Sequence, residues 1–73
     1  MQTIADLMGL WPSVSEFARD IGVQPTHAHV MKVRGSIPSA RWAAVVEAAK
    51  TRGIPGVTFE KLAELAARRK AAA

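Results

Sequence analysis

The stretch Ser-Val-Ser-Glu-Phe-Ala-Arg-Asp-Ile-Gly-Val-Gln-Pro-Thr-His-Ala-His-Val-Met, residues 13–31, places two short helical patterns on either side of one glycine. The first pattern opens at Ser13, whose side chain can cap a helix. Glu16, three residues later, has the spacing that returns a hydrogen bond to the Ser13 backbone in a capping box. Apolar residues then recur at helical spacing and form one face: Phe17, Ala18 and Ile21.

The glycine between the two patterns predicts a short, sharp turn. Gly22 follows the last apolar position of the first helix, where a chain leaving a helix often adopts a positive φ. Pro25 stands where the second helix would begin, because its fixed φ suits the first helical position. Ala18 fits a steep crossing of the two helices, since only a small side chain can occupy their point of contact. The inward face of the second helix continues with Ala28 and Met31, and Gly35 is placed to end it.

Three further helices are predicted around this pair. The first covers roughly residues 3–10 and presents Ile4, Leu7 and Met8 on one side. Another follows Pro38 over about residues 39–52, with a buried stripe of Trp42, Val45, Val46 and Ala49. The last covers about residues 58–70 after a Thr58 cap, with an apolar face of Phe59, Leu62, Ala63, Leu65 and Ala66. Because strand patterns are absent, we expect one all-α domain over residues 1–73, a compact bundle of about five short helices.

Length and composition narrow the class of protein. The chain has 73 residues, near the small end of what folds alone, and it has no cysteine to form disulfides or thiolate metal sites. No apolar run approaches the roughly 18 residues of a membrane span, and the first residues lack the basic and apolar regions of a secretory signal. We therefore expect a soluble, cytoplasmic protein that does not associate with membranes.

Positive charge is concentrated in one part of the chain. The formal net charge is +4, and the sequence pI is about 10.4. Residues 24–52 contain one acid, Glu47, and five basic residues: Lys32, Arg34, Arg41, Lys50 and Arg52. The excess therefore falls on the second helix of the pair and on the residues after it, which favours a polyanionic partner.

Residues 13–41 resemble the Cro/C1-type helix-turn-helix domains of phage and bacterial repressors. The resemblance is carried by residues 17–23, by the helical segment 24–32 and by the exit Arg-Gly-Ser-Ile-Pro at residues 34–38. It implies a lambda-repressor-like fold, with the helix-turn-helix over about residues 13–34. It also implies a prokaryotic or phage protein that binds duplex DNA and regulates transcription.

In such a domain the amino-terminal part of the second helix enters the major groove. The residues expected to contact bases are Gln24, Pro25, Thr26, His29 and Val30. For Val30 two roles stay open, because an apolar side chain there could lie against a thymine methyl or close the core. The residues expected to neutralise phosphates beside the groove are His27, Lys32, Arg34 and Arg41.

Catalysis and metal binding are not expected. His27 and His29, the only histidines, are two residues apart and so point to different faces of a helix. The serines read as caps or turn residues, and so small a helical domain rarely forms a cleft of ligand size. We expect no enzyme activity, no cofactor and no small-molecule ligand.

The final helix has two possible uses. It can cover the domain's own core, or it can pair with a second subunit, since helix-turn-helix proteins commonly read paired half-sites as dimers. The residues expected at such a dimer interface are Phe59, Leu62, Leu65 and Ala66. The function expected is that of a homodimeric repressor that occupies a promoter. The alternative is a protein-interaction module, such as an antitoxin-like partner or a subunit that recruits another protein to DNA.

Overall fold

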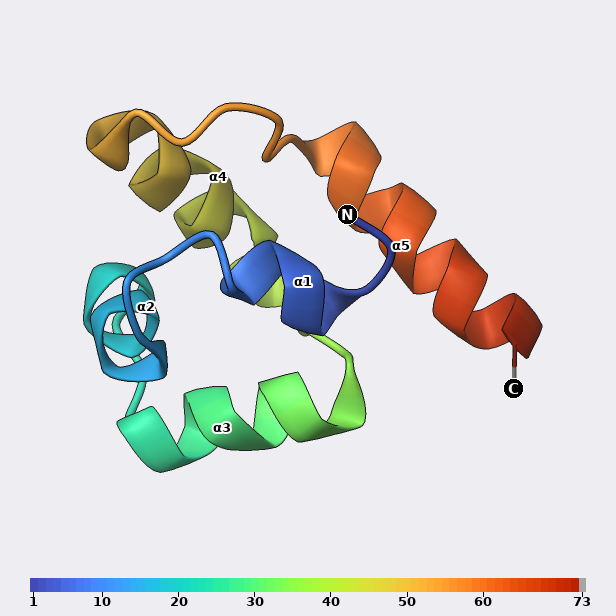
Figure 1. Ribbon diagram of the computed structural model, residues 1–73, viewed down its shortest axis with the longest axis horizontal. Coiled ribbons are helices and arrows are strands. Elements are labelled where there is room, and N and C mark those ends of the chain that lie inside the picture. Colours follow the sequence, from blue (N-terminus) through green and yellow to red (C-terminus); the bar gives the residue numbers. More distant parts are fainter. Residues whose placement is uncertain (73) are drawn as a thin grey trace.

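The computed structural model describes residues 1–72, which form five α-helices and one turn of 3-10 helix. In chain order these are α1 (Ile4–Met8), α2 (Val14–Ile21), α3 (Pro25–Arg34), the turn η1 (Ser39–Arg41), α4 (Trp42–Arg52) and α5 (Phe59–Ala72). The expected all-α architecture is confirmed for these residues, and they contain no strand. In Figure 1, α1 lies in the middle of the bundle, with α3 along one edge, α4 on the opposite side and α5 at the end.

The first two helices begin at side-chain caps. Thr3 accepts the backbone N–H of Asp6, and the Asp6 carboxylate accepts the Thr3 N–H at 3.2 Å, which completes a capping box. The backbone N–H of Gln2 also donates to this carboxylate, and these bonds lower the pKa of Asp6.

At α2 the expected capping box forms only in part. The Ser13 hydroxyl accepts the Glu16 N–H at 3.1 Å. The Glu16 carboxylate pairs instead with the guanidinium of Arg52, at 2.7 Å from Nη2. The guanidinium carries a full positive charge that attracts the carboxylate, whereas the backbone amide is neutral, so the carboxylate turns toward α4.

The turn between α2 and α3 has the expected form. Gly22 adopts φ 76° and ψ 33°, a left-handed conformation that glycine reaches without a steric penalty. The backbone N–H of Val23 donates to the carbonyl of Ala18 at 3.0 Å, which closes the end of α2. Gln24 is extended, and Pro25 occupies the first turn of α3. Helices α2 and α3 are therefore joined by only three residues and pack directly against each other.

All five helices contribute to one core. Its largest fully buried side chains are Phe17, Leu7, Leu62, Leu65 and Val45. Trp11, in the loop between α1 and α2, packs edge-on against Phe17, with ring centroids 4.9 Å apart and planes at 89°. Ala18 has no exposed surface, as expected for a helix crossing.

The helices of residues 1–72 include none with the length and apolar composition of a membrane span.

The apolar face predicted for α5 is only partly buried in the structure. Leu62 and Leu65 are fully buried against the rest of the domain, whereas the Phe59 side chain is 53% exposed. Ala66 is also exposed. Of the four residues expected at a dimer interface, Leu62 and Leu65 therefore belong to the monomer's own core. The reason is that α5 supplies the large side chains that α1 and α4 need to complete a core in so short a chain.

Candidate nucleic-acid interface

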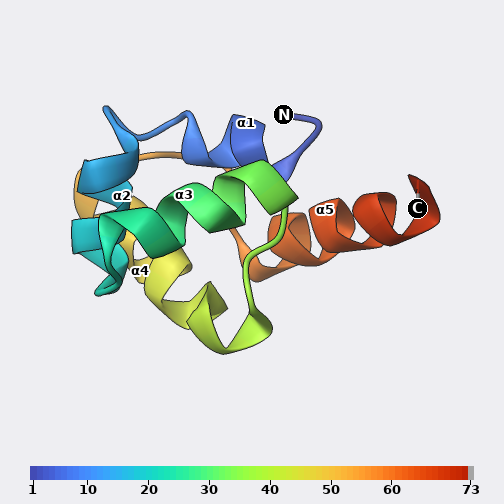
Figure 2. The same ribbon diagram turned by 90° about the horizontal axis from the view of Figure 1, so that it is seen from below.

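Helix α3 contacts the rest of the domain along one side only. Ala28 and Met31 are its buried residues, and they face α2 and α1. Figure 2 shows α3 nearest the viewer, running between α1 and the start of α4. In the described chain, no other element crosses its outer side, which leaves a complete helix face at the surface.

The side of α3 opposite Ala28 and Met31 forms what we call the outer ridge. Successive residues of an α-helix are about 100° apart around its axis, and this spacing places four exposed residues on the ridge. They are Thr26, His29, Val30 and Val33. Val33 is 71% exposed and Val30 43% exposed, so both apolar side chains lie at the surface. For Val30 this excludes the core position that the sequence left open.

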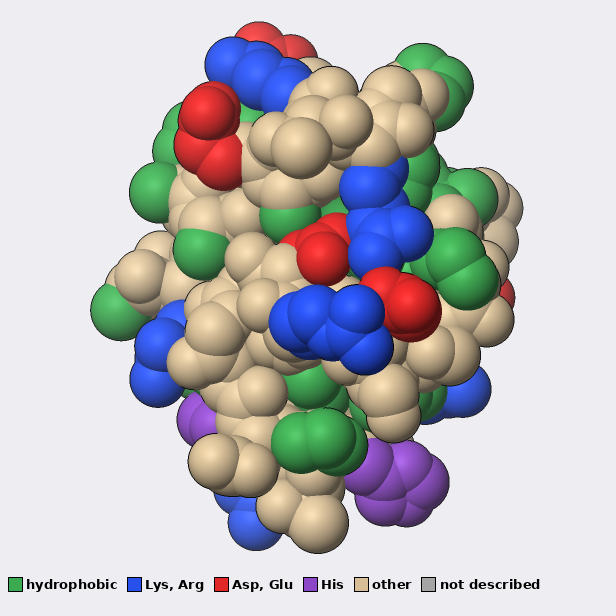
Figure 3. Space-filling view, turned by 90° about the vertical axis from the view of Figure 1, so that its left-hand side faces the viewer, with side chains coloured by type: hydrophobic (Ala, Val, Ile, Leu, Met, Phe, Trp, Pro, Cys, Tyr) green, Lys and Arg blue, Asp and Glu red, His purple; other side chains and the backbone are tan. Residues whose placement is uncertain are grey.

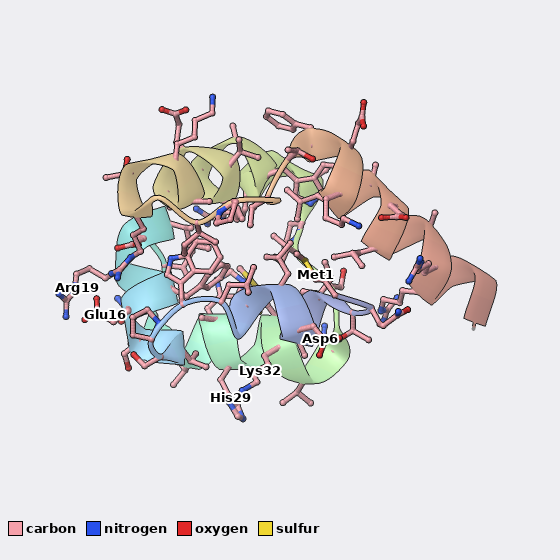
Figure 4. The ribbon with its side chains drawn as sticks, turned by 45° about the horizontal axis from the view of Figure 1, so that its top comes forward. Met1, Asp6, Glu16, Arg19, His29 and Lys32 are labelled. Carbon is pink, nitrogen blue, oxygen red and sulfur yellow. The ribbon has the colours of Figure 1, made fainter. Side chains whose placement is uncertain are left out.

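Basic side chains flank the outer ridge on both sides. Lys32 and Arg34 are two residues apart, hence about 200° apart around the axis, and both are exposed. His27 lies on the same flank as Arg34. In Figure 4, His29 and Lys32 extend from α3 away from the body of the domain. The arrangement is a ridge of short side chains between two basic edges.

Nearby acids do not neutralise these basic side chains. No Asp or Glu occurs between Asp20 and Glu47, a segment that contains all of α3, η1 and the first part of α4. Among the side chains that the structure describes, Lys32, Arg34 and Arg41 form no ion pair with a carboxylate. The positive charges of Lys32, Arg34 and Arg41 are therefore not offset by any described carboxylate within ion-pair distance.

Of the five basic residues in the segment 24–52, Lys50 and Arg52 do not belong to the basic surface beside α3. Arg52 pairs with Asp20 and Glu16, and its side chain is only 28% exposed. Lys50 lies 3.7 Å from the carboxylate of Glu47. Figure 3 shows basic and acidic side chains next to one another on the face that α2 and α4 share, whereas the histidines lie at the lower end of the view. The basic surface beside α3 is thus smaller than the sequence total indicates.

The amino-terminal end of α3 carries no side-chain cap. Gln24 precedes the helix but makes no capping hydrogen bond. The first-turn N–H groups of Thr26 and His27 are thus left for an outside acceptor, at the positive end of the helix dipole.

At the carboxyl-terminal end of α3, Arg69 of α5 donates to the carbonyl of Arg34 at 2.9 Å. This contact ties the carboxyl-terminal end of α3 to the domain.

The structure places most of the expected site residues on one surface. All five expected base-contacting residues are at least partly exposed: Gln24, Pro25, Thr26, His29 and Val30. Of the expected phosphate-contacting residues, His27, Lys32 and Arg34 are exposed, and Arg41 is half-buried at the end of η1, just before α4. Val33 is an addition that sequence reasoning missed. Its position seven residues after Thr26, on the same helix face, was the available signal.

Neither a metal-ligand cluster nor an exposed tryptophan occurs on this surface in the described residues. In the described part of the chain, no three His, Asp or Glu side chains gather closely enough to hold a metal ion. The indole N–H of Trp42 donates to the carbonyl of Ile37 at 2.8 Å, and this side chain is half-buried rather than exposed for base stacking.

Comparisons of the chain with protein-family models, with curated proteins and with solved structures find no match.

Proposed function

We propose that this protein is a helix-turn-helix regulator that binds duplex DNA with α3 in the major groove. The observation that carries the proposal is the outer side of α3, an exposed ridge between two basic edges that lack acidic partners among the described side chains. The major groove of B-DNA, about 12 Å wide, admits one α-helix. In this pose α3 lies along the groove, so that the whole ridge, and not only its amino-terminal part, faces base edges. Lys32 and Arg34 then face the phosphates of opposite strands.

The basic flanks supply affinity and the ridge supplies specificity. Gln24 can form paired hydrogen bonds with adenine, Thr26 can bond either kind of base, and His29 can donate or accept. Phosphate contacts from Lys32 and Arg34 act on every sequence alike. The proposed regulatory sense is repression, because a domain bound over a promoter excludes polymerase from the same DNA. This role would be carried out in the cytoplasm.

We further propose that the protein binds as a homodimer through the exposed side of α5. Phe59, Ala63 and Ala66 are exposed and fall on one side of this helix, next to the side that buries Leu62 and Leu65. A single α3 reads few base pairs, whereas two copies about 34 Å apart read two half-sites on the same face of DNA. Among the described side chains on this side of α5, Phe59 is the largest, and it is the expected centre of the contact.

Selection from a random pool of duplex DNA tests the proposed function. We expect the protein to enrich a two-fold symmetric sequence, and Lys32→Ala to weaken binding to both enriched and random duplexes. Lys50→Ala is the matched control, because Lys50 is an exposed lysine away from α3 and should change little. A protein that retains no duplex at low salt would instead be an interaction module, the competing role for this fold.

A further inference from the structure

We infer that Val33 and Val30 read the 5-methyl group of pyrimidines in the major groove, an inference that rests on the proposed DNA-binding role. The chemical class of ligand is a base pair that carries a methyl at pyrimidine C5. Thymine and 5-methylcytosine both present this methyl at the same place in the groove. The carboxyl-terminal half of the outer ridge consists of Val30 and Val33, which cannot form hydrogen bonds with a base. A methyl group is the partner that we assign to them.

The exposure of the two valines is the first observation. Val33 is 71% exposed and Val30 is 43% exposed, although Ala28 and Met31 already provide the apolar contact of α3 with the core. Val33 lies about one turn beyond Val30 on the same face, a rise of about 4.5 Å. Stacked bases along one strand are about 3.4 Å apart. The two side chains therefore match methyl groups on adjacent or nearly adjacent base pairs.

The chemistry of the ridge is the second observation. No Arg, Lys, Asn or Gln occupies the four ridge positions, so this half of α3 has no bidentate partner for guanine or adenine. A valine has no hydrogen-bonding group, and the only feature of a base edge that it contacts favourably is the methyl at C5. An unmethylated cytosine or a uracil in the same place would leave a gap.

The charges beside the valines favour DNA over a second copy of this chain as the partner of the outer ridge. Lys32 and Arg34 flank Val33 on both sides, and neither has an acidic partner among the described side chains. Two copies that met through this ridge would bring these like charges together. A duplex instead brings phosphates to both flanks while its base edges meet the valines.

Uracil substitution removes a single methyl group and tests the inference directly. Each thymine of a duplex selected from a random pool is replaced in turn by deoxyuridine, and the dissociation constant is measured by fluorescence anisotropy. At one or two positions we expect about a fourfold loss of affinity, the value for withdrawing one buried methyl group. In Val33→Ala or Val30→Ala the same uracil should cost less than about twofold, because the contact is already absent. Circular dichroism checks that these surface variants stay folded.

A second arm separates the two sources of the methyl group. At each uracil-sensitive position the pair is changed to cytosine or to 5-methylcytosine opposite guanine. We expect wild type to prefer the methylated form by about fourfold, and the alanine variant of the valine that contacts that position to lose the preference. Tight binding to the unmethylated selected duplex assigns thymine as the natural source. Binding of the 5-methylcytosine duplex that is tighter than binding of the selected thymine duplex assigns 5-methylcytosine.

Two different binding results would contradict the methyl contact and the proposed DNA binding. Salt-dependent binding to a selected duplex, with every thymine replaceable by uracil at no cost, would overturn the methyl contact and leave DNA binding intact. Absence of binding to any duplex would overturn the proposed function itself. Equal sensitivity to uracil in wild type and in both valine variants would show that another side chain reads the methyl.

Discussion

The guanidinium of Arg52, on α4, donates to both carboxylate oxygens of Asp20, on α2, with Nη2 at 3.2 Å from Oδ1. The indole of Trp11 donates to the same carboxylate at 3.0 Å. These bonds connect α2, α4 and the loop after α1 at one place. They also neutralise Arg52, which therefore holds the helices together and is not available to a phosphate.

This ion pair predicts how stability depends on pH. The hydrogen bonds from Arg52, and next that from Trp11, lower the pKa of Asp20 below its ordinary value of 3.8. A carboxylate with a lowered pKa in the folded state stabilises the fold above 3.8, and this stabilisation is lost as the pH falls through the folded-state pKa. Asp20→Asn should therefore unfold at lower urea concentration than wild type at about pH 7, and the difference should shrink below 3.8. Glu47→Gln, an exposed acid beside Lys50, should have little effect at either pH.

The salt dependence of DNA binding should reveal how many basic residues meet phosphates. If the three residues expected to meet phosphates, Lys32, Arg34 and Arg41, all do so, the log–log slope of affinity against salt should be about −2.7 per protomer, from about 0.9 counterions per contact. If Lys50 and Arg52 also took part, the slope would approach about −4.5. Arg34→Ala should reduce the slope by about 0.9. A slope near zero would contradict a phosphate-facing surface.

The crossing of α2 and α3 should not tolerate a larger residue at position 18. Ala18 has no exposed surface, so Ala18→Leu should destabilise the domain by about 1–3 kcal/mol through overpacking. Ala43→Leu places the same side chain on the exposed side of α4 and serves as the control. Thermal unfolding of both variants measures the difference. Equal melting temperatures would mean that space is available at the crossing.

Leu65 should behave as a core residue. It is 2% exposed, so Leu65→Glu buries a charge without a partner and costs more than the roughly 2–5 kcal/mol of a Leu→Ala substitution. In a domain of marginal stability this should abolish folding, which loss of the helical circular dichroism signal would report. A folded Leu65→Glu protein would contradict the packing of α5 against the core.

A substitution at Phe59 should affect dimerisation without affecting folding. Because its side chain is 53% exposed, Phe59→Glu should leave the helical signal and the melting temperature nearly unchanged. If α5 forms the dimer contact, sedimentation should show a monomer, and affinity for a two-half-site duplex should fall toward that for one half-site. Glu60→Gln, on the next residue of α5, is the control. A Phe59→Glu protein that still dimerises would place the contact elsewhere.

Local sequence determined much of the helical architecture. Thr3, Ser13 and Thr58 each accept a backbone N–H three residues later, and Gly22 adopts the left-handed conformation that ends α2. These features involve neighbours in the chain, so residue type and spacing are enough to predict them. The exposed face of α3 was predictable for the same reason, since its periodicity marks Ala28 and Met31 as the inward residues.

Only the tertiary structure decided what distant residues do to one another. Glu16 has the spacing of a capping box, but Arg52 arrives from α4 and takes its carboxylate. The same contact removes Arg52 from the basic surface, and the packing of α5 divides one apolar face into buried Leu65 and exposed Phe59. Sequence periodicity gives the direction in which a side chain points along its own helix. It does not give which other helix lies there, because that depends on how all five helices fill one core.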